Sequence, residues 1–206
     1  MAAMPDMPPS SPSAAEVEAQ LAALASRHSV GPKYLAEPAP TDAELARAVT
    51  VALSAPDHAG LKPFRFVQVG ADQRDALGAL FAEGARLRDQ GSDEIERARE
   101  RARNGPALLA LVFRGREGVR DVPMREQWAS AGAALMNLLN ALHLMGYGAK
   151  TLSGASVDDP PVRDAFCGEG ESLLCWVVCG TATERPKPRY AADPSQVLQR
   201  WKGPQD

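Results

Sequence analysis

Two short amphipathic helices are predicted in the first quarter of the chain, each introduced by a capping box. Ser13 is followed three residues later by Glu16, and Thr41 is followed by Glu44 in the same way. In such a pair each side chain satisfies a free backbone N–H of the first helical turn. Apolar residues then recur at helical spacing, which predicts one helix over residues 14–27 and another that begins after Thr41.

The middle of the chain predicts three further helices. Asp72 is the predicted N-cap of the first. The second begins near Ser92, carries alternating charges typical of a solvated face, and ends at Asn104-Gly105-Pro106. The longest runs from near Pro123, a good first-turn residue, to Gly146, a natural C-terminal cap. Because this helix is apolar most of the way round, it lies either at the centre of the domain or at a subunit interface.

Three strands are predicted between these helices. Residues 64–69 alternate between apolar and polar, as a half-buried strand does, whereas residues 107–113 and 173–179 are continuous apolar runs typical of central strands. A short helix is predicted near residues 161–166. Strands separated by helices indicate a mixed α/β or α+β sheet with helices packed on it.

Composition restricts the class of protein. A chain of 206 residues is long enough for one domain with its own hydrophobic core, and 45% hydrophobic residues exclude disorder for most of it. With a net charge of −3, the protein lacks the excess of basic residues that nucleic-acid-binding proteins carry. Only 5% of the residues are aromatic, so few side chains are available to stack on bases. We therefore expect a globular protein with no nucleic-acid partner.

The termini and the cysteines indicate a cytoplasmic protein. Residues 1–12 are rich in proline and lack a secretory signal, so we expect a flexible tail there and a single domain over residues 13–206, with an extended C-terminal tail from about residue 182. No segment is apolar and long enough for a membrane span. Cys175 and Cys179 would share one face of a strand, and we interpret them as core residues rather than as metal or redox ligands.

Chemical motifs of general type are absent from the sequence. There is no GxGxxG, GxxxxGK[ST], HExxH or GxSxG, and the turn at Gly168-Glu169-Gly170 is a weak phosphate loop. Arg27 and Ser29 lie at the end of the first helix and offer a guanidinium and a hydroxyl group, which together suit a phosphate monoester. The alternative is that they are an ordinary arginine at a helix end and an ordinary serine in a turn. His58, in a loop, either points at a ligand or is an ordinary loop histidine. His143, on the apolar helix, is interpreted as an interior or interface residue.

Four segments taken together resemble a known family. They are Arg27-His28-Ser29-Val30, residues 53–66 (LSAPDHAGLKPFRF), residues 129–148 ending in LMGYG, and Leu152-Ser153-Gly154-Ala155 followed by residues 161–166 and Cys179-Gly180-Thr181. In this order and spacing the chain resembles the flavin-dependent nitroreductases, most closely their shortest, minimal branch of NAD(P)H nitroreductases. That branch carries RRS, APDH…QPW, GxG, WRSG and LGT at the corresponding places, and the resemblance covers residues 14–181.

The resemblance implies an α+β nitroreductase-like fold, with a central mixed or antiparallel sheet flanked by helices and a long buried helix at the dimer interface. It implies a homodimer with two FMN sites, each built from both subunits, that passes hydride from NAD(P)H through FMN to nitroaromatic, quinone or similar acceptors in a ping-pong cycle. Because the flavin carries the chemistry, no catalytic residue and no metal are assigned. The implied cofactor-binding residues are Arg27, His28, Ser29, His58 (from the partner subunit), Lys62, Thr151, Leu152 and Ser153.

The sequence departs from the pattern of the branch at several of these positions. The departures are His28 for the second Arg of RRS, Lys62 for Gln and Phe64 for Trp in QPW, and Thr151-Leu152 for the Trp-Arg of WRSG. A cation at Lys62 would favour the anionic reduced flavin. Lys187 and Arg189 either replace the positive charges that are lost from the predicted phosphate site, or they are solvated residues of the tail. The departures also support an alternative function, a flavin-binding or degenerate non-catalytic dimer with a sequestering or structural role.

Overall fold

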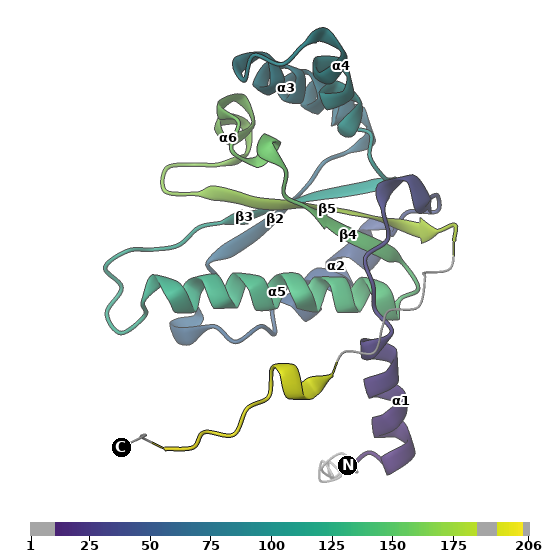
Figure 1. Ribbon diagram of the computed structural model, residues 1–206, viewed down its shortest axis with the longest axis vertical. Coiled ribbons are helices and arrows are strands. Elements are labelled where there is room, and N and C mark those ends of the chain that lie inside the picture. The colour runs from purple at the N-terminus through teal and green to yellow at the C-terminus, as the bar shows by residue number, and fades with distance from the viewer. Residues whose placement is uncertain (1–10, 185–192, 204–206) are drawn as a thin grey trace, which may run out of the picture.

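The computed structural model describes residues 11–184 and 193–203, and its centre is a five-stranded antiparallel sheet (Figure 1). Strand β5 pairs with both β3 and β4, β2 pairs with β3, and β1 pairs with the end of β5, where Leu35 lies opposite Ala182. The strands are β1 (Leu35–Ala36), β2 (Phe64–Gln68), β3 (Ala107–Phe113), β4 (Gly148–Leu152) and β5 (Ser172–Ala182). The structure therefore confirms an α+β fold and shows that the sheet is antiparallel rather than mixed.

Helices cover both faces of this sheet (Figure 1). One face carries α2 (Asp42–Ala52) and α5 (Met124–Leu144), and the other carries α3 (Arg74–Leu87), α4 (Ser92–Arg101) and α6 (Pro160–Phe166). Helix α1 (Ala14–Ala25) lies outside both layers and contains no buried residue. Short 3₁₀ turns occur at Pro32–Tyr34, His58–Gly60, Ala71–Gln73, Ala155–Val157 and Pro194–Gln196.

Strand β5 divides its side chains between two hydrophobic cores, one on each face of the sheet. Trp176 belongs to the core beneath α3 and α6, where Phe81 and Phe166 meet its ring edge to face at centroid distances of 5.4 and 5.0 Å. Cys175 and Cys179 belong to the core beneath α2 and α5. Burial raises the pKa of Cys175 to about 11 and that of Cys179 to about 12, so both thiols stay protonated. This confirms their interpretation as core residues.

Most of the predicted helices are confirmed. Both capping boxes form, with Glu16 N–H donating to Ser13 Oγ at 3.3 Å and an equivalent bond at Thr41. Helix α1 ends at Ala25 rather than at residue 27, and α5 follows Pro123 as predicted. Gly146 adopts the left-handed conformation (φ +90°) of a C-terminal cap just beyond α5.

The prediction that Asp72 caps a helix is wrong. Asp72 lies within a 3₁₀ turn, and α3 begins at Arg74 without a side-chain cap. The buried guanidinium of Arg74 donates to the carbonyl oxygens of Ala102 (2.8 Å) and Pro106 (3.3 Å). The start of α3 is therefore fixed by contacts to the segment after α4, which the local sequence does not reveal.

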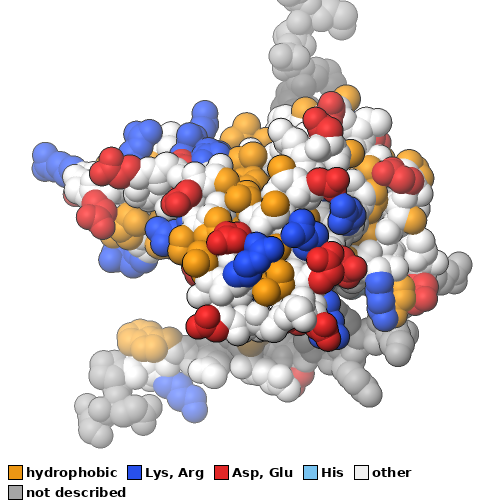
Figure 2. Space-filling model, turned by 90° about the horizontal axis from the view of Figure 1, so that it is seen from above, with side chains coloured by type: hydrophobic (Ala, Val, Ile, Leu, Met, Phe, Trp, Pro, Cys, Tyr) orange, Lys and Arg blue, Asp and Glu red, His pale blue; other side chains and the backbone are white. Residues whose placement is uncertain are grey.

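The surface over α3 and α4 carries charges of both signs interleaved with apolar side chains (Figure 2). On α4, Arg97 lies 3.5 Å from Glu94 and Arg99 lies 3.4 Å from Glu96, which confirms the predicted solvated, charged face. Among the described residues, no helix is both long and apolar enough to cross a membrane. The same part of the chain holds no group of three His, Cys, Asp or Glu residues that could bind a metal ion.

Candidate functional site

The segment that follows α1 is held alongside strand β4. Ser29 forms a parallel bridge with Ala149, and the N–H of Val30 donates to the carbonyl oxygen of Ala149 at 3.0 Å. Gly148 makes this close approach possible, because a Cβ there would lie 2.9 Å from side-chain carbons of both Val30 and Leu35. The structure thus brings the first of the four segments to the strand that leads into the fourth, with Thr151 and Leu152 at its end.

The end of α1 is tied to the end of α5 through His143. Its Nε2 lies 3.0 Å from the carbonyl oxygen of Ala23 and 2.9 Å from Oγ of Ser26. A carbonyl oxygen can only accept, so Nε2 carries the proton. His143 therefore has partners within the chain, as predicted, and it fixes the helix end from which Arg27 projects.

Two polar side-chain atoms at this helix end are buried without a partner among the described residues. Nε of Arg27 and Nε2 of His28 make no hydrogen bond to any described residue. Nδ1 of His28 lies 3.2 Å from the carbonyl oxygen of Ser26 and so carries the proton of the neutral ring, which means that Nε2 donates only in the imidazolium form. The unsatisfied buried Nε–H of Arg27 is destabilising by about 1–3 kcal/mol, and an anion would relieve this. The guanidinium present here therefore fits a phosphate group.

A cavity of about 310 Å³ opens at the loop after β4. It lies between this loop and helices α3 and α4, and its volume is at the lower end of the range for small-molecule sites. Leu152 and Ser153 form part of its wall, with Trp176 beside Leu152 on the neighbouring strand. Two arginines also reach it, but Arg88 is paired with Asp159 and Arg101 with Glu94.

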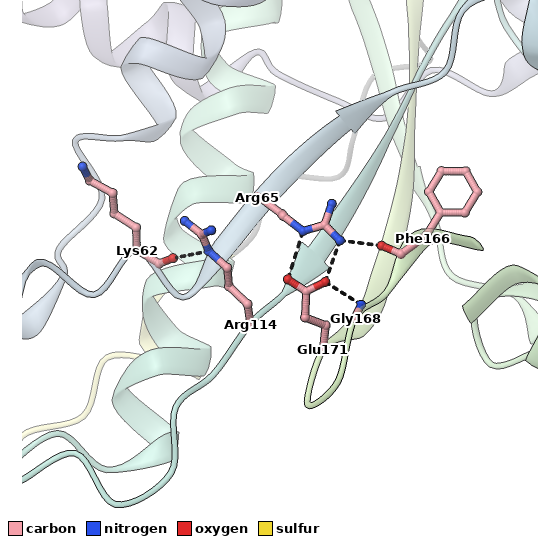
Figure 3. Close-up of polar contacts among 6 residues, drawn as sticks. All are labelled: Lys62, Arg65, Arg114, Phe166, Gly168 and Glu171. Atoms are coloured by element: carbon pink, nitrogen blue, oxygen red, sulfur yellow. Dashed lines mark hydrogen bonds and ion pairs between the residues drawn. The ribbon is translucent and has the colours of Figure 1, made fainter. Parts of the chain in front are cut away.

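His58 and Lys62 lie at a different place, on the loop between α2 and β2. Nδ1 of His58 donates to Oε2 of Glu126 in the first turn of α5 at 2.9 Å. The carbonyl oxygen of Lys62 accepts from Nε of Arg114 at 2.9 Å (Figure 3). Both side chains are exposed, so this loop presents an imidazole and an ammonium group to the outside of the protomer.

The two groups of predicted cofactor-binding residues are separated by the length of α5. Glu126, beside His58, and His143, beside the end of α1, are 17 residues apart on one helix. At a rise of 1.5 Å per residue this corresponds to about 26 Å. Within one protomer, Ser29 therefore lies beside β4, the strand that ends at Thr151 and Leu152, whereas His58 and Lys62 lie at the opposite end of α5.

Helix α5 exposes several large apolar side chains. Trp128 and Met136 are 43% and 41% exposed, and Leu144, in the last turn, is 59% exposed. The ring of Trp128 stacks on Phe113 at a centroid distance of 3.7 Å. Large apolar side chains exposed on one helix are a candidate for protein–protein contact.

Comparison with known proteins identifies the family. The sequence matches the Nitroreductase family over residues 24–181. The chain belongs to the nitroreductase family. A relative from Escherichia coli K12, named "Putative NAD(P)H nitroreductase YdjA", is 32% identical over 148 residues, which cover 71% of this chain and 80% of the relative.

Solved structures show the same fold. A nitroreductase-like family protein from Bacillus cereus superposes with a TM-score of 0.75 at 16% identity, covering 89% of this chain and 96% of that one. The FMN and NADPH-dependent nitroreductase NfnB of Sphigopyxis sp. strain HMH gives a TM-score of 0.66 at 20% identity, covering 89% of this chain and 99% of that one. These similarities confirm the nitroreductase-like fold implied by the four segments.

This nitroreductase also contains a polar cluster that the sequence did not indicate. Arg65 on β2 donates to both carboxylate oxygens of Glu171, at 3.0 and 2.6 Å, and to the carbonyl oxygen of Phe166 (Figure 3). The N–H of Gly168 donates to Glu171 at 2.9 Å. These bonds, with the Arg65 charge, lower the pKa of Glu171 from 4.5 to about 2. The turn considered as a weak phosphate loop is thus closed by the chain's own carboxylate.

Two cations of the C-terminal tail are candidates either for phosphate contact or for simple solvation of the tail. Lys187 and Arg189 lie outside the described residues, as does most of the predicted N-terminal tail. The described part of the tail, residues 11–13, leads directly into α1. Among the described residues, the predicted phosphate contacts are therefore Arg27, His28 and Ser29.

Proposed function

We propose that this nitroreductase is an FMN-dependent NAD(P)H oxidoreductase that works as a homodimer on nitroaromatic, quinone or similar planar acceptors. Family membership supports the reaction class. The E. coli relative is named as an NAD(P)H nitroreductase, and the NfnB structure is described as FMN and NADPH-dependent. Both the cofactor and the reductant therefore have support among proteins that this chain resembles.

The observation that carries the homodimer is the division of the site between the two ends of α5. In a two-fold dimer the same surface is used by both copies. If two α5 helices pack antiparallel through their exposed sides, which carry Trp128 and Met136, the His58 end of one lies at the Arg27 end of the other. Each of the two sites then combines Arg27–Ser29 and Thr151–Ser153 of one subunit with His58 and Lys62 of the second.

Each residue has a role that follows from its chemistry. Arg27 supplies a permanent forked cation and Ser29 a hydroxyl for the phosphate of FMN. The pairing of Nδ1 of His58 with Glu126 leaves its Nε2 available to a ligand. When bound, FMN supplies the redox chemistry, taking hydride from NAD(P)H and passing electrons to the acceptor. The protein binds the flavin, orients it and places charge beside it.

The visible spectrum of the purified protein tests this function. We expect a yellow protein with absorbance near ~450 nm that bleaches under anaerobic NADPH or NADH, because the flavin is then reduced. A yellow protein that neither reductant bleaches would instead support the non-catalytic flavin-binding alternative. A colourless protein that does not bind added FMN would refute both.

Mixed dimers test whether the site is shared between subunits. We expect Arg27→Ala and Lys62→Ala each to weaken FMN binding when the variant forms dimers alone. In a heterodimer of the two variants, one site carries both substitutions and the other carries neither. Random mixing should therefore restore roughly a quarter of the wild-type sites. No restoration, with mixing verified by differently tagged chains, would show that each site lies within one subunit.

A further inference from the structure

The backbone of Lys62 adopts a conformation that lysine rarely takes. Its φ is +47°, and Ala59 (φ +64°) and Gly60 (φ +65°) just before it are also left-handed. A left-handed backbone is unfavourable for a residue with a Cβ. Such conformations persist where surrounding contacts impose them, and they concentrate at ligand-binding and active sites.

Contacts from two other residues impose this conformation. The carboxylate of Asp57 accepts the N–H of Lys62 at 2.7 Å with one oxygen and the N–H of Leu61 at 3.1 Å with the other. From the opposite side, Nε of Arg114 donates to the carbonyl oxygen of Lys62 at 2.9 Å (Figure 3). The backbone of Lys62 is thus held at both its N–H and its carbonyl group.

The side chain of Lys62, in contrast, is not engaged. It is exposed, and its ammonium group forms no ion pair with the described residues. Figure 3 shows it extending away from Arg114 and from the cluster of Arg65 and Glu171. Backbone strain of this kind suggests a function for the residue that carries it, and the free ammonium of Lys62 is the group available for one.

We propose that Asp57 and Arg114 are positioning residues that fix the backbone of Lys62 and thereby set where its ammonium meets the flavin held by the partner subunit. This inference rests on the proposed function, since it requires FMN in the shared site. An ammonium close to the flavin ring stabilises the negative charge that the ring gains on reduction. Loss of either positioning residue therefore destabilises the reduced flavin even though Lys62 itself is retained.

The midpoint potential of FMN in the loaded dimer measures this effect. Lys62→Gln should weaken binding of reduced relative to oxidised FMN by about tenfold, which lowers a two-electron potential by about 30 mV. Asp57→Asn keeps the side-chain shape but loses one of the two acceptor oxygens, so it should lower the potential in the same direction. The double variant should lie no lower than Lys62→Gln alone, because both act through one ammonium group.

A second pair of variants separates positioning from general electrostatics. Arg114→Ala should lower the potential, whereas Arg116→Ala removes a cation from the same loop without touching Lys62 and should leave the potential unchanged. In the FMN-free protein, amide hydrogen exchange at Leu61 and Lys62 should accelerate in Asp57→Asn. This readout does not depend on the cofactor.

Each outcome bears on one of the two proposals. A wild-type protein that binds no FMN refutes the proposed function. If wild type binds FMN but Lys62→Gln leaves the potential unchanged, Lys62 does not meet the flavin and the inference fails. The inference also fails if Lys62→Gln lowers the potential while Asp57→Asn and Arg114→Ala do not, or if the effects of Asp57→Asn and Lys62→Gln add.

Discussion

The pairing of Arg65 with Glu171 makes the stability of this nitroreductase depend on pH in the acid range. Glu171 accepts two bonds from the guanidinium and one from the N–H of Gly168, and it is mostly buried. Replacing it by glutamine keeps the side-chain shape and removes the charge. We expect Glu171→Gln to destabilise the protein at neutral pH and to flatten its acid stability profile.

The magnitude follows from the difference between the folded and unfolded pKa of Glu171. A folded pKa of about 2 against 4.5 corresponds to about 3 kcal/mol of stability. Since Arg65 is one-third exposed, screening by solvent reduces the expected contribution to about 2 kcal/mol. The folded pKa is the lower one, so the contribution is fully present above pH 4.5. It is lost as the pH falls through about 2.

Urea unfolding between pH 2 and 7 tests this expectation. The free energy of unfolding of wild type should exceed that of Glu171→Gln by about 2 kcal/mol at pH 7, and the two curves should converge between pH 4.5 and 2. Glu169→Gln, an exposed neighbour on the same turn, is the matched control and should follow wild type throughout. Parallel curves for wild type and Glu171→Gln would refute the reasoning.

Three further predictions concern FMN binding at Arg27, the close packing at Gly148 and the proposed dimer. Arg27→Ala should weaken FMN binding by about 1.5–3 kcal/mol, or roughly 10–150-fold, and unchanged affinity in a fluorescence titration would show that the phosphate binds elsewhere. Gly148→Ala should destabilise by about 1–3 kcal/mol, because its Cβ would lie 2.9 Å from two side chains. Gly31→Ala, whose Cβ would make an ordinary contact of 3.6 Å with the Tyr34 ring, should change stability by less than about 1 kcal/mol. Equal effects in urea unfolding would contradict this. Met136→Glu should dissociate the proposed homodimer in sedimentation experiments by placing a charge on the exposed side of α5, and a dimer that persists would exclude that side as the interface.

The elements that sequence predicts well are those whose determinants are close together in the chain. The pairs Ser13–Glu16 and Thr41–Glu44 lie within one turn, and each marks the start of a helix in the structure. Strand β4 was not predicted, since GAKTL has no apolar alternation and begins with glycine. It is a strand because β5 pairs with one edge and Ser29 bridges to the other, which are both long-range contacts.

In the candidate site, too, features set by neighbouring residues can be predicted from the sequence, whereas features set by long-range contacts cannot. The candidate phosphate contacts Arg27 and Ser29 can be recognised from the residue types alone, but the place of Ser29 beside β4 depends on a bridge between residues 120 positions apart. The left-handed backbone of Lys62 had no sequence signal, because lysine is not a residue that favours it. It arises from hydrogen bonds to Asp57 and Arg114, and the latter is distant in sequence.

Helix α1 supplies no side chain to either hydrophobic core of the protomer, and its attachment to α5 runs through its last turn by way of His143. Folding of the protomer therefore places little constraint on the first two turns, where drift or shortening would leave the cores intact. The final turn is different, because it sets the direction from which Arg27 leaves the helix. In this part of the chain, selection on ligand binding would act on where the helix stops rather than on how long it is.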